Sequence, residues 1–378
     1  MFIDQATADA RLIKKAEYSA CTEAFLDCRL PGSVPKENYS LIGPGVTQSR
    51  SQVINLREPH GFNIGAAAMP NGITNNLHIH FTAEVFLCLR GEWLFRCGPN
   101  GEQATYLAKA GDVFSVPTWI FRGFTNVGPD DGWLFTCLGG DDTGGVIWSP
   151  DIMRAANESG LYLSEENALV DVASGETLPE GQSYIKPFPQ EAIDELRVVS
   201  PEEIRRRIVT REERQFSDRA VLDSVLPGHG AELAPIIGYG ITQDRNQHPA
   251  ITTPHGFTIE WLRIPVGKTM GSFRIAEKMV LIQTQGQMRI DYNQGAPAVT
   301  VEMSAEDTCS IDGQIWRQFT NIGEEPVECL LITAGDQRKH PEFSPELVQA
   351  AYEAGLERDA YGYLVKTGLI INNTLLKV

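Results

Sequence analysis

Two histidines and a glutamate in the segment HIHFTAEVFLCLRG, residues 78–91, have the residue types and spacing of metal ligands. His78 and His80 are separated by a single residue, and Glu84 follows four positions later. Because alternate side chains of a β-strand share a face, we expect the three groups to project from one face of a strand. Two imidazoles and a carboxylate that converge on one point bind a divalent first-row metal and leave coordination positions open. The segment therefore predicts a metal site, since burial of these groups without partners would be unfavourable.

The elements that must position these groups occur twice in the chain, at an offset of 195 residues. IGPGVTQSR at residues 42–50 reappears as IGYGITQDR at 237–245, and SPDIMRAANESGL at 149–161 corresponds to SPELVQAAYEAGL at 344–356. Self-similarity at a fixed offset is the signature of repeated structural units. We expect two copies of one domain.

Each copy is composed of short apolar or alternating runs, such as VFLCLRG and WLFRCG, separated by glycine, proline and asparagine turns. This pattern is typical of β-sandwiches and β-barrels. Each copy then ends with a helix, for which Ser149 and Ser344 are the expected N-caps and the prolines that follow them are the first helical residues. The sequence predicts an all-β fold with an N-terminal domain at residues 1–162, a linker with helical segments at 163–232 and a C-terminal domain at 233–378.

The first of two motifs that define the cupin superfamily, G-x5-H-x-H-x3-E-x6-G, is matched at every fixed position. The matching residues are Gly72, His78, His80, Glu84 and Gly91. With the internal duplication, the chain resembles a bicupin and is distantly similar to bicupin dioxygenases of the gentisate dioxygenase and quercetinase types. The resemblance implies two tandem jelly-roll barrels, each a double-stranded β-helix, with a metal held inside by the motif histidines and glutamate.

The second cupin motif, G-x5-P-x-G-x2-H-x3-N, is matched only in part. Gly111, Pro117 and Asn126 fit it, but Trp119 replaces the middle glycine and Arg122 replaces the histidine. In enzymes of the gentisate dioxygenase type that late histidine is a ligand and the glutamate is not. The resemblance implies one divalent transition metal, for which Fe, Mn, Ni and Zn are candidates, on His78, His80 and Glu84.

The second copy serves as an internal control for the metal site. The positions equivalent to the three ligands are Phe273, Ile275 and Met279, all of which are apolar. None of them offers a nitrogen or oxygen donor to a cation. The C-terminal domain is therefore predicted to be degenerate and free of metal.

Arg122 allows two interpretations. Its guanidinium, which is always charged and cannot bind a metal, could orient the carboxylate or enolate of a substrate by a bidentate contact. Arg317 occupies the same position in the second copy, which favours a structural ion pair instead. We predict Arg122 as a catalytic and substrate-binding candidate and keep the ion pair as the alternative.

Three further residues occur only in the first copy and are candidates for substrate binding. Cys88, Trp93 and Trp119 correspond to Gln283, Met288 and Gln314. A tryptophan near the cavity could stack on a planar substrate, and Cys88 could approach the metal. The alternative is that they are apolar wall or core residues.

An open metal site of this kind suits a substrate with adjacent oxygen atoms. The first hypothesis is a dioxygenase-like oxidoreductase acting on a small carboxylated, possibly aromatic compound that chelates the metal. The second is a non-redox cupin isomerase, lyase or hydrolase, and the third is a non-catalytic metabolite-binding protein. Turnover without oxygen separates the first from the second, and metal content separates both from the third.

The bulk composition excludes several partners. A net charge of −17 and a pI near 4.9 disfavour nucleic acid and anionic membranes, because the field of the protein repels phosphate. The chain has no apolar run of the roughly 20 residues that a membrane span needs and no signal-peptide core, so a cytoplasmic location is expected. We expect a small anionic substrate and, because cupins associate through barrel edges, a homo-oligomer.

Overall fold

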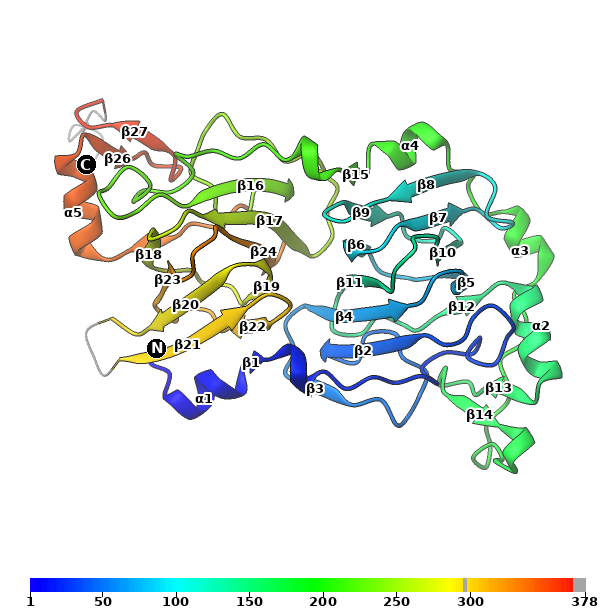
Figure 1. Ribbon diagram of the computed structural model, residues 1–378. Helices are drawn as coiled ribbons and strands as arrows, with labels where there is room; N and C mark the ends of the chain where they lie inside the picture. The colour runs from blue at the N-terminus through cyan, green and yellow to red at the C-terminus, as the bar shows by residue number, and fades with distance from the viewer. Residues whose placement is uncertain (295–297, 370–378) are drawn as a thin grey trace, which may run out of the picture. The chain divides into compact units, whose positions relative to one another are not determined.

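The structure is a computed structural model that describes residues 1–294 and 298–369, and it divides into two β-barrel units (Figure 1). The N-terminal barrel is built from Glu17–Glu213. The C-terminal barrel is built from Arg214 onward together with Met1–Ala16. These boundaries differ from those expected from the sequence, because residues 1–16 pack with the C-terminal barrel and most of the expected linker packs with the N-terminal one.

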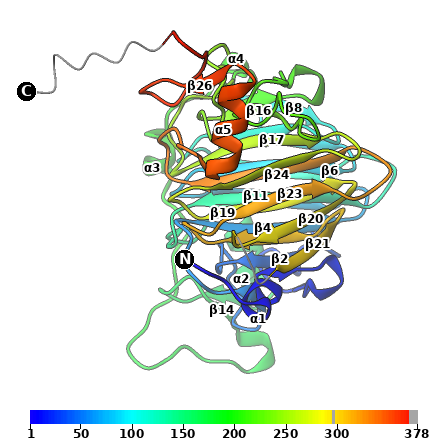
Figure 2. The same cartoon turned by 90° about the vertical axis from the view of Figure 1, so that its left-hand side faces the viewer.

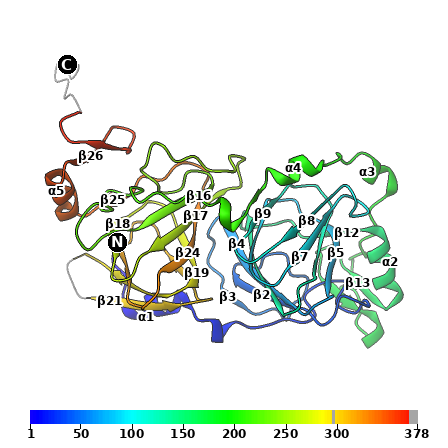
Figure 3. The ribbon, with the colours of Figure 1, turned by 45° about the horizontal axis from the view of Figure 1, so that its top comes forward.

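The N-terminal barrel consists of a seven-stranded sheet, ordered β15-β9-β6-β11-β4-β2-β3, and a five-stranded sheet, ordered β12-β5-β10-β7-β8. Strands β4 and β5, one from each sheet, lie on opposite sides of the barrel (Figure 3). All neighbours pair antiparallel except β2 and β3. The strands are β2 (Glu37–Ile42), β3 (Ile54–Leu56), β4 (Phe62–Met69), β5 (Thr74–Ile79), β6 (Glu84–Arg90), β7 (Trp93–Cys97), β8 (Ala104–Ala108), β9 (Val113–Val116), β10 (Arg122–Asn126), β11 (Gly132–Gly139), β12 (Ile147–Trp148) and β15 (Ile208–Val209).

The C-terminal barrel repeats this topology with a six-stranded sheet, ordered β1-β22-β19-β24-β17-β16, and a five-stranded sheet, ordered β21-β20-β23-β18-β25. Its strands are β1 (Leu12–Ile13), β16 (Glu232–Ile237), β17 (Phe257–Ile264), β18 (Thr269–Arg274), β19 (Met279–Gln285), β20 (Gln287–Tyr292), β21 (Val299–Ser304), β22 (Thr308–Ile311), β23 (Arg317–Asn321), β24 (Val327–Ala334) and β25 (Glu342–Phe343). The predicted all-β fold of two tandem barrels is therefore confirmed.

Helices are short and lie outside the barrels. They are α1 (Gln5–Ala10), α2 (Pro150–Glu158), α3 (Gln190–Asp194), α4 (Pro201–Arg205) and α5 (Pro345–Glu353), with 3-10 turns η1 (Lys15–Glu17), η2 (Val172–Ser174) and η3 (Arg211–Glu213). The two helices expected after Ser149 and Ser344 are α2 and α5, and each begins with its proline. Figure 2 shows α5 outside the strands of the C-terminal barrel. None of the helices in the described part of the chain has the length and apolarity that a membrane span requires.

Each of these two helices leads into a small hairpin. The strands β13 (Leu161–Leu163) and β14 (Leu169–Asp171) follow α2, and β26 (Leu356–Arg358) and β27 (Leu364–Lys366) follow α5. The duplication therefore extends beyond the barrel strands to the elements that close each copy.

Each barrel is also completed by an arm that comes from the other half of the sequence. Strand β1 of the N-terminal arm pairs with β22 of the C-terminal barrel, and β15 pairs with β9 of the N-terminal barrel. The two arms have the same order of helix, two-residue strand and 3-10 turn, and their sequences RLIKKAE (residues 11–17) and RIVTREE (207–213) are similar. The repeated unit is thus an arm followed by a barrel, and each arm covers an edge strand that would otherwise be unpaired.

Candidate metal centre

The three predicted ligands come from two strands that belong to different sheets. His78 lies on β5, His80 directly follows this strand, and Glu84 begins β6. The expectation that all three project from one face of a single strand was wrong, because the chain turns at residues 80–83 and crosses from one sheet to the other. The three side chains converge because the chain crosses between the sheets here and places the Glu84 carboxylate close to the two imidazoles.

A bulge in β5 brings a further side chain of this strand to the cavity that His78 lines. Arg122 of β10 is paired with His78, whereas Phe124, two residues later, is paired with Asn75, so β5 carries one extra residue between these pairs. A bulge of this kind changes which side chains face the interior. Asn75 and His78, three residues apart, consequently both line the cavity of the barrel.

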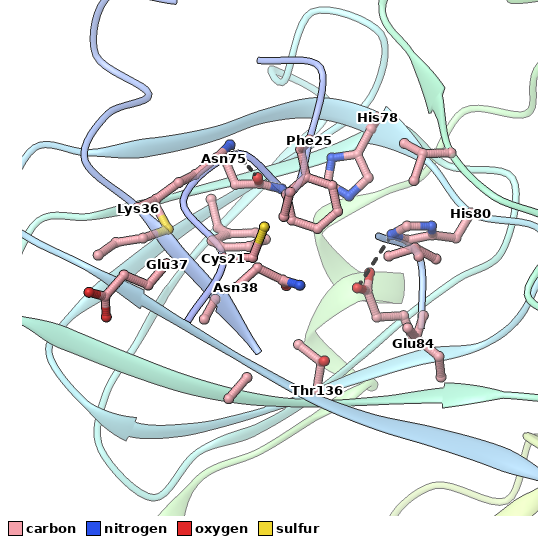
Figure 4. A pocket seen from close by; sticks show the side chains of 18 of the residues that line it. Cys21, Phe25, Lys36, Glu37, Asn38, Asn75, His78, His80, Glu84 and Thr136 are labelled. Atoms are coloured by element: carbon pink, nitrogen blue, oxygen red, sulfur yellow. Dashed lines mark hydrogen bonds and ion pairs between the residues drawn. The ribbon is translucent and has the colours of Figure 1, made fainter. Parts of the chain in front are cut away.

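The donor atoms of the triad are close together and shielded from solvent. The candidate ligand atoms of His78, His80 and Glu84 all lie within 4.8 Å of one another, and His80 Nε2 is 3.5 Å from Glu84 Oε1. The three residues are 3%, 1% and 4% exposed, respectively. Figure 4 shows His80 and Glu84 facing each other, with His78 beside them.

Backbone carbonyls orient both imidazoles. His78 Nδ1 is 2.6 Å from the carbonyl oxygen of Asn76, and His80 Nδ1 is 3.4 Å from that of Gly145. A carbonyl at Nδ1 favours the tautomer that is protonated there, which leaves the Nε2 lone pair free for a metal.

The protonation states suit coordination as well. Burial lowers the pKa of His78 to about 3 and that of His80 well below its ordinary value, and Arg122 lowers both further. The imidazoles are therefore neutral at physiological pH, which is the form that binds cations. Two neutral imidazoles and one carboxylate fit a divalent transition metal.

Arg122 forms an ion pair with the third ligand. Its Nε donates to Glu84 Oε2 at 2.9 Å and its Nη1 donates to the carbonyl of Ile120 at 3.1 Å. The side chain is fully buried and is not among the residues that line the cavity. Burial raises the pKa of Glu84, and Arg122 opposes this shift. The geometry is that of the structural ion pair, which leaves Glu84 Oε1 facing His80.

The equivalent arginine of the second copy has different partners. Arg317 Nε donates to the carbonyl of Ile315 and its Nη2 to that of Asp312, each at 3.0 Å. Met279 stands where the N-terminal barrel has Glu84. The buried arginine is thus common to both copies, and its pairing with a ligand is specific to the first.

The other substrate-binding candidates lie away from the cavity wall. Cys88 and Trp93 are fully buried in an apolar cluster with Phe95 and Phe114, and Trp93 Nε1 donates to the carbonyl of Arg90 at 2.8 Å. Trp119 is 43% exposed. The structure brings none of the three predicted side chains to the walls around the triad, so the function proposed below does not use them.

A cavity adjoins the triad inside the N-terminal barrel. The volume that water-sized molecules can occupy in it is about 50 Å³. Phe86, Phe124 and Trp148 form much of its apolar wall, and Phe25 lies between the triad and the opposite side in Figure 4. Lys36 and Asn75 lie on that opposite side. The cavity therefore has a ligand-rich end and a second polar end, a composition typical of small-molecule sites.

The same space is filled in the C-terminal barrel. Phe273, Ile275 and Met279, at the positions of the triad, are at most 2% exposed and belong to the apolar core. Leu262 is also part of this core, where the N-terminal barrel has the smaller Ala67 at its cavity wall. The C-terminal barrel thus lacks the donor groups at these positions, and larger apolar side chains fill the adjacent space.

Comparison with known proteins supports the fold. No family model matches the chain, and no curated protein sequence matches it. Among solved structures it is similar to the oxalate decarboxylase of Lactobacillus farciminis, with 13% identity, 89% coverage of both chains and a TM-score of 0.55. It is also similar to vicilin of Corylus avellana, with 8% identity, 88% coverage of both chains and a TM-score of 0.52. The 7S globulin of Momordica charantia matches with 10% identity, 88% coverage of this chain, 86% of the globulin and a TM-score of 0.53.

The chain folds as a bicupin. The match extends over both barrels, so the duplicated architecture is shared and not only one domain. Within this bicupin the N-terminal barrel carries the candidate metal centre, and the C-terminal barrel carries a packed apolar interior. At these identities the similarity establishes the fold alone, and the activity has to be argued from the site.

Proposed function

We propose that this bicupin is a metal-dependent enzyme that acts on a small anionic molecule in the cavity of its N-terminal barrel. The observation that carries the proposal is the joint presence, in one copy only, of the three donors and the cavity beside them. A purely structural metal site would be closed by protein ligands, whereas three protein ligands leave positions for a substrate.

The protein groups have separate roles in this proposal. His78, His80 and Glu84 hold the metal, which when bound polarises a coordinated oxygen or, if it is iron, activates dioxygen. Arg122 is a positioning residue that fixes Glu84 through the bond to Oε2. The apolar wall of Phe86, Phe124 and Trp148 limits water around the reacting groups.

The charges of the site favour an anionic substrate. The buried charged groups at the cavity are paired, Glu84 with Arg122 and Asp27 with Lys36. A bound divalent cation therefore adds charge that no buried protein group compensates. A carboxylate that binds next to it restores neutrality in a region of low polarity.

The reaction proposed first is dioxygenase-like oxidation of a small carboxylated compound, in line with the resemblance to bicupin dioxygenases. The second candidate is cleavage or isomerisation without net oxidation, and the observation that favours it is the similarity to oxalate decarboxylases. The third candidate is a non-catalytic metabolite-binding protein, which binds small molecules without turnover.

The test begins with protein loaded separately with Fe(II), Mn(II), Ni(II) or Zn(II). Each form is incubated with small hydroxy acids and catechol carboxylates, in air and under argon, while substrate loss and oxygen uptake are recorded. Oxygen uptake that matches substrate loss supports the dioxygenase, and equal turnover under argon assigns the second candidate. A protein that binds none of the four metals contradicts the proposed function.

A further inference from the structure

A polar wall lines the cavity opposite the triad, and it is confined to the first copy. Its members are Lys36, Asn38, Asn75 and Thr136, and the partly exposed Glu37 lies beside Lys36 and accepts a hydrogen bond from Tyr39 Oη at 2.6 Å. The equivalent positions of the second copy all belong to the apolar core of the C-terminal barrel, and they are Ala231, Leu233, Met270 and Leu331. The polar wall is therefore present where the metal ligands are present and absent where they are absent.

Lys36 is the charged member of this wall. It is 5% exposed, forms an ion pair with Asp27 and donates to Asn75 Oδ1 at 2.8 Å. Burial lowers its pKa, and Asp27 opposes that shift. An ammonium group has three donors, and two of those of Lys36 are used in these contacts. The third N–H has no hydrogen-bond acceptor among these contacts, and the ammonium lies 5.6 Å from the centre of the Phe25 ring, which also lines the cavity.

The second copy shows that the lysine is not required by its aspartate. Asp223 is the counterpart of Asp27, and its Oδ2 accepts from the backbone N–H of Gly271 at 2.7 Å, much as Asp27 accepts from that of Asn76 at 3.1 Å. The second partner of Asp223 is His229 Nδ1, at 2.7 Å. A histidine thus takes the place of the lysine as side-chain partner of the aspartate in the second copy, so the ion pair alone does not explain why the first copy has a lysine that lines the cavity.

Lys36 enters the cavity at the point where the two copies differ in length. Leu30-Pro31-Gly32 aligns with Leu226-Pro227-Gly228 at an offset of 196, but from Lys36 onward the offset is 195. The first copy therefore has one extra residue between positions 33 and 36. This insertion and the replacement of an alanine by lysine fall at the same place in the cavity wall.

We infer that Lys36 is the second anchor of the substrate and receives a carboxylate at the end of the cavity opposite the metal. The substrate class is then a small molecule with chelating oxygen atoms at one end and a carboxylate at the other. Arg122 does not supply this contact, because its Nε is bound to Glu84 and the residue is not among those that line the cavity. This inference rests on the proposed function, since the metal holds the other end.

The test uses three pairs of probes that share a chelating end and differ in one carboxylate. The pairs are malate with 2-hydroxybutanoate, 2-hydroxyglutarate with 2-hydroxypentanoate, and 3,4-dihydroxybenzoate with 4-methylcatechol. Binding to the metal-loaded protein is measured by calorimetry. The carboxylate-bearing member of at least one pair is expected to bind about tenfold more tightly or better, as for a hydrogen bond to a charged group.

Lys36→Met is expected to remove this preference while it leaves unchanged the metal content and the affinity for the member of each pair that lacks the additional carboxylate. Because the substitution leaves the buried Asp27 without a counter-charge, the double variant Asp27→Asn, Lys36→Met is measured in parallel and should give the same loss of preference. If Lys36 had only a structural role, both variants would keep the parent's preference for the carboxylate-bearing probe.

The outcomes separate the inference from the function on which it rests. A parent protein that takes up no metal contradicts the proposed function. A parent that takes up metal but prefers the carboxylate in no pair overturns the role of Lys36. The role of Lys36 is also overturned if both variants keep the parent's preference for the carboxylate-bearing probe.

Discussion

The contact between Arg122 and Glu84 joins a fixed positive charge to a candidate metal ligand in a place without solvent. Glu84 therefore has two alternative counter-charges, the arginine on Oε2 and a cation near Oε1. Breaking a buried ion pair from one side leaves an uncompensated charge, which typically destabilises a protein by about 3 kcal/mol or more. The residue pair thus links the stability of the barrel to its metal content.

Arg122→Met is predicted to lower the free energy of unfolding of the metal-free protein by about 3 kcal/mol. Added metal should recover more stability in this variant than in the parent, because it replaces the lost counter-charge. Urea unfolding with and without metal measures both effects. Arg317→Met is the matched control, and there metal should restore nothing beyond what it gives the parent. Equal stability of metal-free parent and Arg122→Met would contradict the pairing.

Single residues were predictable from the sequence to different degrees. His78, His80 and Glu84 stand out by spacing and by their apolar counterparts in the second copy. The partner of Arg122 could not be chosen, since an ion pair depends on two strands meeting in space. Lys36 was not predicted, because its contact with Asn75 of β5 joins two segments that meet only in the folded barrel.

At the scale of elements, β5 and β18 are equivalent strands, but β5 carries polar residues, including a candidate ligand, where β18 carries apolar core residues. Both carry a bulge, because Phe273 is paired with Arg317 and Met270 with Phe319, as His78 is with Arg122 and Asn75 with Phe124. The bulge is thus a property of the fold, and the residues it directs inward decide whether the barrel holds ligands or a core.

Phe273→Ala is predicted to cost about 3 to 5 kcal/mol of stability, because it leaves a cavity among fully buried side chains. Metal content should not change. Denaturant unfolding and elemental analysis of the same preparation measure the two quantities. His78→Ala, at the equivalent position, is the matched variant and should show a large loss of metal. Loss of metal in Phe273→Ala would indicate that the C-terminal barrel takes part in binding.

The arms make a separate prediction about strand edges. Deletion of residues 1–13 removes β1 from β22 and takes Ile3 and Ala8 out of the core of the C-terminal barrel. Backbone amides of β22 should then exchange hydrogen faster, while those of β9, covered by β15, should keep their protection. Hydrogen-exchange mass spectrometry measures both strands in one experiment. Unchanged exchange in β22 would contradict the pairing of the arm.

The barrel strands and the closing helices could be predicted, because turn residues and a Ser-Pro pair before each helix mark them in both copies. Ser344 caps α5 through its side chain, whereas Ser149, at the N-cap position of α2, makes no side-chain capping bond. The arms could not, since a two-residue strand has no periodicity to detect. Their similarity also appears at an offset of 196, one residue away from the offset of the barrels. A search at the barrel offset alone leaves them unmatched.

For the molecule as a whole, duplication has produced one barrel with a candidate site and one with a packed interior. Their backbones share the same strand order, and the positions of the triad and of the polar wall carry apolar core residues in the C-terminal barrel. A single site per chain is the expected consequence. The expected homo-oligomer remains a prediction, which light scattering of the purified protein tests.

The most direct test of the account is the metal content of the purified chain after incubation with Fe(II), Mn(II), Ni(II) or Zn(II), measured by elemental analysis. The parent and Phe273→Ala are predicted to hold one equivalent of metal per chain, and His80→Ala and Glu84→Ala close to none. A parent without metal, or an His80→Ala variant that keeps a full equivalent, would contradict the central claim that the N-terminal barrel binds a metal through these three residues.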